Sequence, residues 1–149
     1  MNKPANILLV EDSRMDIELT LDAFKEARMN NPIYVVNSGK DALDYLFRRE
    51  KYANRSEYPL PDLILLDLKM PGIDGFEVLK QVKSAPVLKR IPVIILTSSK
   101  QEGDRALSYD NGANSYLVKP ISFEGFLEVA KKIEGYWLLL NTSPPESDL

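Results

Sequence analysis

Four short apolar runs in the sequence each end in side chains that can do chemistry. These side chains are Glu11 and Asp12 after residues 7–10, Asp67 after residues 63–66, Thr97 after residues 91–96, and Lys119 after residues 115–118. A short apolar run bounded by turn residues is typical of a strand buried on both faces of a parallel sheet. A carboxylate that closes such a strand needs partners, because burial of an unpaired charge is costly. Asp67 is therefore the candidate reactive group.

The elements that must position these side chains alternate along the chain. Residues 33–36 form a fifth apolar run, and helices are predicted to begin near Ser13, Ser38, Gly75, Gln101 and Ser122. Five strands alternating with five helices predict an α/β fold with a doubly wound parallel sheet of order 2-1-3-4-5 and helices on both faces. In that order the four strands that end in reactive side chains are neighbours, so those side chains converge on one crevice.

Three carboxylates brought into one crevice need more than one positive charge. At an effective dielectric constant of about 20, each close pair repels by roughly 4 kcal/mol, and a single ammonium cannot neutralise Glu11, Asp12 and Asp67 together. Two carboxylates, a backbone carbonyl and waters form a ligand set that Mg²⁺ accepts. With Mg²⁺ and Lys119 nearby, Asp67 could attack a phosphoryl group and Thr97 could help to hold the product.

Composition limits the class of protein and the partners that the chain can have. The 149 residues, with 44% hydrophobic residues and a net charge of −3, fit one globular domain without a general affinity for nucleic acid or anionic membranes. No apolar run approaches the roughly 18 residues of a membrane span, so we expect a cytoplasmic protein. The absence of Cys and His excludes disulfides and a Ser-His-Asp triad, and any phosphohistidine must lie on another protein. The segment 48–61 is predicted to be a long solvated connection.

Four motifs in order carry a family resemblance. They are Val-Glu-Asp-Ser at 10–13, Leu-Asp-Leu-Lys-Met-Pro-Gly-Ile-Asp-Gly at 66–75, Leu-Thr-Ser at 96–98, and Val-Lys-Pro at 118–120. At these spacings the chain resembles a response-regulator receiver domain of two-component signalling, with a flavodoxin-like (βα)5 fold. The resemblance covers about residues 5–137. It places the domain at 1–141 and leaves 142–149 as a tail that we expect to be disordered.

The resemblance implies a role for each reactive side chain. Asp67 would accept a phosphoryl group from a histidine kinase in a Mg²⁺-dependent phosphorelay reaction, with Mn²⁺ able to replace Mg²⁺. The metal ligands would be Asp12, Asp67 and the backbone carbonyl of Lys69, with Glu11 acting through water, and the phosphoryl group would contact Thr97 and Lys119. The side chain of Lys69 has a second interpretation, in which it tunes the lifetime of the phosphoprotein.

Two further residues have roles implied by the resemblance. Tyr116 matches the switch aromatic, which turns inward as Thr97 moves, and Pro120 is expected to follow a cis peptide bond. Each site residue also has a plainer interpretation when taken alone. Tyr116 could be an ordinary core or surface aromatic, and Asp12 could simply cap the helix after it.

The end of the sequence bears on output and partners. Residues 138–149 are too few for a DNA-binding module, so we expect a stand-alone regulator that acts through protein contacts. The segments 48–61 and 133–137 resemble single-domain regulators that partner phytochrome-type histidine kinases. Residues 137–140 predict a homodimer surface together with the fourth helix, fifth strand and fifth helix; the alternative is a final turn folded back on its own core.

Two rival functions remain in view. A phosphatase of the haloacid dehalogenase type normally needs a second Asp two residues after its nucleophile, where this chain has Lys69, and its nucleophile lies on the first strand. A receiver-like scaffold that never takes phosphate usually lacks Asp67, Lys119 or the acidic pair. We therefore predict a signalling protein and not an enzyme, whose chemistry is limited to self-phosphorylation and slow autodephosphorylation.

Overall fold

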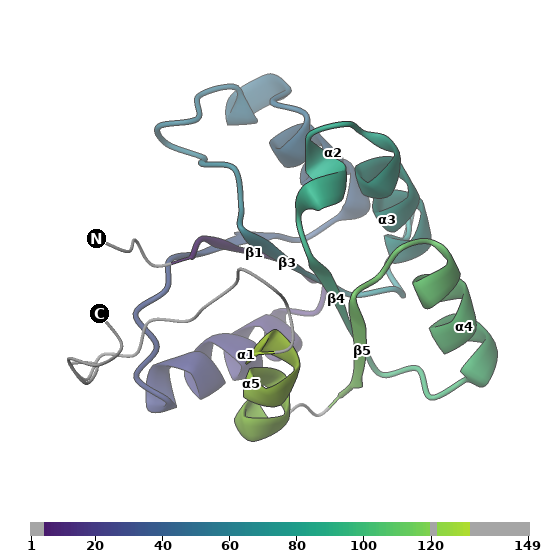
Figure 1. Ribbon diagram of the computed structural model, residues 1–149. Coiled ribbons are helices and arrows are strands. Elements are labelled where there is room, and N and C mark those ends of the chain that lie inside the picture. The colour runs from purple at the N-terminus through teal and green to yellow at the C-terminus, as the bar shows by residue number, and fades with distance from the viewer. Residues whose placement is uncertain (1–4, 120–121, 132–149) are drawn as a thin grey trace.

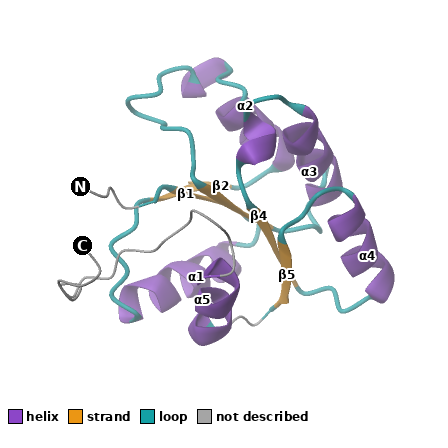
Figure 2. Ribbon diagram, viewed as in Figure 1, coloured by secondary structure: helices purple, strands orange, loops and turns teal. Residues whose placement is uncertain are grey.

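The computed structural model describes residues 5–119 and 122–131 (Figure 1). Its strands are β1 (Ile7–Val10), β2 (Ile33–Val36), β3 (Leu63–Leu66), β4 (Val93–Thr97) and β5 (Ser115–Val118). Its α-helices are α1 (Arg14–Glu26), α2 (Gly39–Leu46), α3 (Gly75–Ser84), α4 (Glu102–Asp110) and α5 (Phe123–Lys131). Two short 3-10 helices, η1 (Glu50–Tyr52) and η2 (Leu88–Arg90), lie in connections. The predicted alternation of strands and helices is thus confirmed (Figure 2).

The sheet has the predicted topology. Its strands are all parallel and are ordered β2-β1-β3-β4-β5. The register aligns the ends of the strands, because Val10 lies opposite Leu66 and Thr97 lies opposite Val118. Asp67, the residue after β3, donates its backbone N–H to the carbonyl of Val10 at 3.0 Å. The residues that follow these strands therefore meet at one edge of the sheet.

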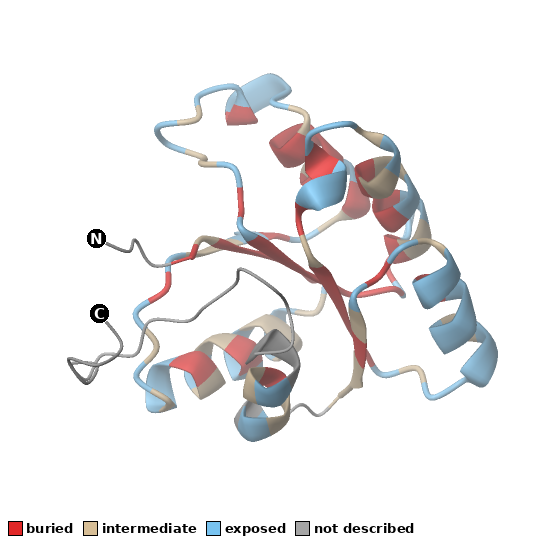
Figure 3. Cartoon of the chain, viewed as in Figure 1, coloured by how far each residue is buried: buried red, intermediate tan, exposed pale blue. Residues whose placement is uncertain are grey.

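Helices cover both faces of the sheet. In Figure 1, α1 and α5 lie on one face, and α2, α3 and α4 lie on the other. Alternate strand residues face the two layers, as the period of a strand requires: Leu8, Ile64 and Ile95 pack toward α2 and α3, and another set packs toward α1 and α5. That second set joins Ile7, Leu9, Leu63, Leu65 and Ile94 to Phe24 and Phe126. Figure 3 shows the result, a buried sheet between helices that are exposed on their outer faces.

Three helices begin with a side-chain cap at the edge of the sheet where the strands β1, β2 and β3 end. Ser13 precedes α1 and accepts a hydrogen bond from the backbone N–H of Asp16 at 3.2 Å, as its sequence pattern predicts. Ser38 caps α2 in the same way. Asp74 caps α3, accepting from the N–H of Glu77 at 3.1 Å. These caps fix where the connections after β1, β2 and β3 end.

The connection from Arg48 to Pro61 differs from its prediction. It contains η1, and Tyr52 within it is only 6% exposed, so the expectation of a solvated segment is wrong for its tyrosines. The rings of Tyr45, Tyr52 and Tyr58 pack together, with centroids 5.0–5.8 Å apart. The guanidinium of Arg55 donates to the backbone carbonyls of Tyr45 and Leu46 at 3.0 and 2.9 Å. The physical reason is that aromatic rings bury a large apolar area even in a polar segment.

Some predictions concern parts of the chain that the structure does not describe. The cis peptide bond at Pro120, the homodimer residues 137–140 and the tail 142–149 lie outside the described residues. Within the described ranges, no helix is both long and apolar enough to cross a membrane.

Candidate functional site

The carboxyl ends of β1 and β3 bring three carboxylates together. One oxygen each from Glu11, Asp12 and Asp67 lies within 4.8 Å of the other two. Glu11 and Asp67 are 1% and 6% exposed, whereas Asp12 is open to solvent. Two buried acids and one accessible acid thus share one small volume. Such a cluster repels itself unless a cation lies among its members.

The side chain of Lys119 supplies one positive charge to this cluster. Its ammonium Nζ donates a short hydrogen bond to Glu11, lies 2.9 Å from Oδ2 of Asp16, and lies 3.9 Å from Oδ1 of Asp67. Only 14% of the Lys119 side chain is exposed. Lys119 reaches the cluster because β5 ends beside β4. The backbone N–H of Lys119 donates to the carbonyl of Thr97 there, at 2.8 Å.

Asp16 is a member of the site that sequence reasoning did not identify. From the sequence alone, Asp16 is only an acidic residue in the first turn of the helix that follows Ser13. Its carboxylate instead turns toward the crevice and accepts from Lys119 at 2.9 Å. Its place in the first turn of α1, immediately beyond Glu11 and Asp12, was the signal that could have revealed it.

Burial and the charge of Lys119 act in opposite directions on the pKa values of the acids in the site. Burial raises the pKa of Glu11 to about 7, and the charge of Asp67 adds to that rise against the hydrogen bond from Lys119. Burial likewise raises the pKa of Asp67, against the opposing effects of the Lys119 charge and of the Glu11 and Thr97 side chains. Burial by itself lowers the pKa of Lys119, but its hydrogen bonds to Glu11 and Asp16 raise it on balance. For Glu11 and Asp67, the effect of burial therefore outweighs that of the one ammonium beside them.

Thr97 and Tyr116 lie on the β4 side of the crevice. Thr97 is fully buried, and its side chain lowers the pKa of the Asp67 carboxyl. The ring of Tyr116 is also buried, and its hydroxyl donates to the carbonyl of Ser99 at 3.0 Å. The N–H of Ser99 in turn donates to the Thr97 hydroxyl at 3.4 Å. Ser99 thus connects the tyrosine to the threonine beside Asp67.

Lys69 places its backbone and its side chain in different surroundings. Its backbone lowers the pKa of the Asp67 carboxyl, whereas its ammonium lies 3.2 Å from Oδ2 of Asp104 in the first turn of α4. Asp104 also accepts from the hydroxyl of Ser99, and that hydrogen bond lowers the pKa of Asp104. Asp104 is a second residue that sequence reasoning missed, because nothing in the sequence of the fourth helix indicates which way its first turn faces.

These residues fit a hard divalent cation. The cluster offers several carboxylate oxygens, an exposed member for access, and two acids whose pKa values are raised by burial. The chemistry open to such a site is nucleophilic attack by Asp67 on a phosphoryl group, with Lys119 and Thr97 available to contact the oxygens of that group.

Comparison with known sequences identifies relatives of similar length. The response regulator receiver domain model matches residues 7–131. The probable methanogenesis regulatory protein FilR2 of Methanothrix harundinacea is 43% identical over 141 residues, which cover 95% of this chain and 88% of that protein. Response regulator Rcp1 of Synechocystis sp. is 39% identical over 143 residues, which cover 96% of this chain and 95% of that protein.

Solved structures of similar sequence share the fold. The bacteriophytochrome response regulator AtBRR is 42% identical, with a TM-score of 0.83 over 95% of this chain and 100% of that one. The phosphorylated cyanobacterial phytochrome response regulator RcpA is 41% identical, with a TM-score of 0.75 over 85% of this chain and 89% of that one. The Mn²⁺-bound form of Rcp1 is 39% identical, with a TM-score of 0.74 over 95% of this chain and 100% of that one.

Proposed function

The chain belongs to the response regulator receiver domain family, and from that premise we propose that it is a stand-alone response regulator phosphorylated on Asp67 by a histidine kinase. The observation that carries this proposal is the placement of Asp67, a buried carboxylate 3.9 Å from the ammonium of Lys119 and within 4.8 Å of two further acids. None of the 149 residues is His, so the proposed phosphohistidine donor is a second protein.

In the proposed transfer, a carboxylate oxygen of Asp67 forms a bond to phosphorus. The bond between phosphorus and the imidazole nitrogen of the kinase breaks, and that nitrogen keeps the electron pair. Lys119 lies close enough to pair with a phosphoryl oxygen, and the buried hydroxyl of Thr97, at the end of the neighbouring strand β4, can turn to another. Both contacts would stabilise the negative charge that the phosphoryl group brings into a buried crevice.

The same proposal assigns the metal site to residues of this chain. Asp12, Asp67 and the backbone carbonyl of Lys69 would hold Mg²⁺, with Glu11 acting through water. The ion supplies positive charge that the acids lack and that the phosphoryl oxygens require. The Mn²⁺-bound state of Rcp1, a relative 39% identical to this chain, supports the expectation that Mn²⁺ can replace Mg²⁺.

The partner and the readout also belong to the proposal. The relatives that are phytochrome response regulators support a phytochrome-type histidine kinase as donor, in the cytoplasm. We propose Thr97 and Tyr116 as the switch, because Ser99 hydrogen-bonds to both of them. A Thr97 hydroxyl that turns toward the phosphoryl group would leave the N–H of Ser99, and the loop that holds Tyr116 would move with it.

Phosphorylation by acetyl phosphate tests the proposal directly. The intact chain with acetyl phosphate and Mg²⁺ is expected to gain the mass of one phosphoryl group, and Asp67→Asn is expected to gain none. Asp22→Asn, which changes an exposed acid on α1, serves as the matched control and should behave as wild type. A gain of mass in Asp67→Asn, or rapid turnover of assorted phosphate esters, would contradict the assignment.

A second variant separates the metal from the acceptor. Asp12→Asn removes an exposed ligand and leaves the buried pair intact. We expect it to need at least about tenfold more Mg²⁺ for half-maximal phosphorylation, while the phosphoryl group still forms on Asp67. An unchanged Mg²⁺ requirement would remove Asp12 from the ligand set.

A further inference from the structure

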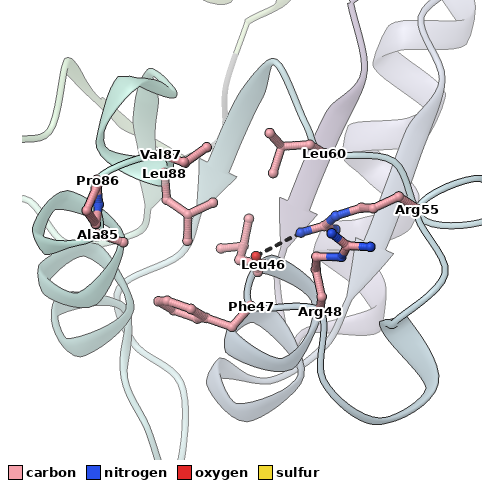
Figure 4. A pocket seen from close by; sticks show the side chains of 9 residues that line it. All are labelled: Leu46, Phe47, Arg48, Arg55, Leu60, Ala85, Pro86, Val87 and Leu88. Atoms are coloured by element: carbon pink, nitrogen blue, oxygen red, sulfur yellow. Dashed lines mark hydrogen bonds between the residues drawn. The ribbon is translucent and has the colours of Figure 1, made fainter.

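A pocket lies at the opposite end of the sheet from the acidic cluster. It has a volume of about 440 Å³ and is formed by the end of α2, the connection after it, and the segment between α3 and η2 (Figure 4). Leu60 in its wall precedes β3, whereas Asp67 follows β3. A pocket of this size lies within the range of about 300–1,000 Å³ that is typical of ligand sites. A ligand there would not compete with phosphorylation.

The floor of the pocket is aliphatic and partly open to solvent. Leu46 and Leu88 form its buried part, and Figure 4 shows Phe47 on one side and Leu60 on the other. Val87 stands at its edge with 64% of its surface exposed. Exposed apolar side chains that are grouped around a concave site are typical of binding sites, whereas single ones occur on any protein surface. The floor would accept a bulky aliphatic side chain.

Positive charge lines one end of the same pocket. Arg48 and Arg55 lie there together in Figure 4, away from Ala85 and Pro86 at the other end. Burial and the charge of Arg48 lower the pKa of Arg55, so the two guanidinium groups repel each other. Arg55 uses its two terminal nitrogens on backbone carbonyls. Within the described residues, Arg48 has neither a hydrogen bond nor an ion pair from its side chain.

The segments around the pocket are positively charged, whereas the net charge of the whole chain is negative. Residues 46–60 and 83–91 contain seven Lys or Arg and two Glu, in a protein whose net charge is −3. None of the residues that line the pocket is acidic. The guanidinium of Arg49 lies 4.9 Å from the centroid of the Phe47 ring, which lines the pocket, and adds a further positive charge beside it. The pocket is therefore complementary to a ligand that is both apolar and anionic.

We propose that this pocket binds an acidic peptide segment of a partner protein. One aliphatic side chain of the peptide enters the floor between Leu46 and Leu88, and adjoining carboxylates pair with Arg48 and Arg49. A nucleic acid fits less well, because the floor is aliphatic and Arg49 covers the ring of Phe47, which leaves no aromatic platform for a base. The docking site goes beyond phosphotransfer, since it lies apart from Asp67 and works in both phosphorylation states.

Peptide binding to the full chain tests this proposal. The probe is a fluorescein-labelled nonapeptide of three Glu-Asp-Leu repeats, and binding is followed by fluorescence anisotropy. We expect saturable binding that weakens as salt is raised. Val87→Asp adds a like charge at the mouth of the pocket, and we expect at least about tenfold weaker binding. Arg48→Asn removes one cation and suits the backbone there, which has a φ of 60°; we expect about threefold weaker binding.

Controls separate this pocket from other surfaces and from phosphotransfer. Leu19→Asp places the same charge at another exposed apolar position, on α1 (58% exposed), and Asp67→Asn removes the proposed phosphoryl acceptor. Both variants should bind the probe as the wild type does. Equal losses in Val87→Asp and Leu19→Asp would overturn the proposal. It would also be overturned by the absence of saturable binding, or by equal affinity for a probe with Gln and Asn in place of its acids. Competition by a single-stranded oligonucleotide, or self-association lost in Val87→Asp, would assign the pocket to another occupant.

Discussion

At the scale of single residues, Lys119 has an unusual number of acidic neighbours. Its ammonium contacts Glu11 and Asp16 and lies 3.9 Å from Asp67, although only 14% of its side chain reaches solvent. Removal of one partner from a buried ionic cluster leaves uncompensated charge, which is more costly than the loss of the contact itself. In the metal-free protein, Lys119 is therefore a structural residue as well as a candidate ligand of the phosphoryl group.

The stability of Lys119→Gln tests this structural role. Lys119→Gln should lower the free energy of unfolding by about 3 kcal/mol in EDTA, because Glu11 and Asp67 keep their burial but lose their cation. Urea denaturation at pH 7.5 measures the change. Mg²⁺ should restore part of the loss, since the proposed ion supplies charge to the same acids.

An exposed lysine provides the control for that measurement. Lys25→Gln alters a solvent-exposed side chain in the last turn of α1, and we expect a change below about 0.5 kcal/mol. Equal stability of Lys119→Gln and Lys25→Gln in EDTA would show that the acids do not depend on Lys119. A loss in Lys119→Gln that Mg²⁺ does not reduce would separate Lys119 from the metal site.

At the scale of secondary structure, short connections tie the site to the helices around it. The loop between β4 and α4 contains Ser99, whose hydroxyl donates to Asp104 and whose carbonyl accepts from Tyr116. Asp104 also pairs with Lys69 from the loop after β3. Ser99 thus connects Thr97, at the end of the strand beside β3, to α4 and β5 through hydrogen bonds.

Helix ends show a second feature at this scale. After α1, Arg28 adopts a left-handed φ of 57°, and the N–H groups of Arg28 and Met29 bond back to Lys25 and Phe24 at 3.0 Å. This is the hydrogen-bond pattern of a helix end that usually carries glycine. An arginine there carries a steric cost that glycine avoids.

Arg28→Gly is therefore predicted to stabilise the protein. We expect the free energy of unfolding to rise by about 0.5–1 kcal/mol, because the left-handed backbone is less strained with glycine. Chemical denaturation measures it. Lys25→Gly, three residues earlier within the helix, should instead lower the free energy by about 1 kcal/mol. A loss of stability in both variants would mean that the backbone at Arg28 is not under strain.

At the scale of the whole molecule, the sequence predicts the framework well and the side-chain partners less well. Apolar runs such as residues 63–66 predict strands buried on both faces, and parallel order then brings Glu11, Asp67 and Lys119 to one edge. Asp16 and Asp104 escaped prediction, because the direction of a side chain in a first turn depends on how its helix packs. The packing of Tyr52 and the pocket beside Arg48 escaped it for a related reason. Both arise from a long connection that has no periodic pattern.

The distribution of exposed apolar residues bears on assembly. Leu107 and Tyr109 on α4 are each 46% exposed, and β5 forms one edge of the sheet. Residues 137–140, Trp-Leu-Leu-Leu, add further apolar side chains after α5 in the sequence. We propose that these features belong to a homodimer surface formed by α4, β5, α5 and the residues after α5.

Sedimentation of the full chain tests this last prediction. We expect the full chain to form a dimer, and a chain that ends before Trp137 to be a monomer at the same concentration. Leu107→Asp should weaken the dimer because it places a charge within an apolar contact, whereas Leu19→Asp on α1 should leave it unchanged. Monomers in both the full and the shortened chain would end the dimer proposal. A lower melting temperature of the shortened monomer would then favour the alternative, in which residues 137–140 pack on the protein's own core.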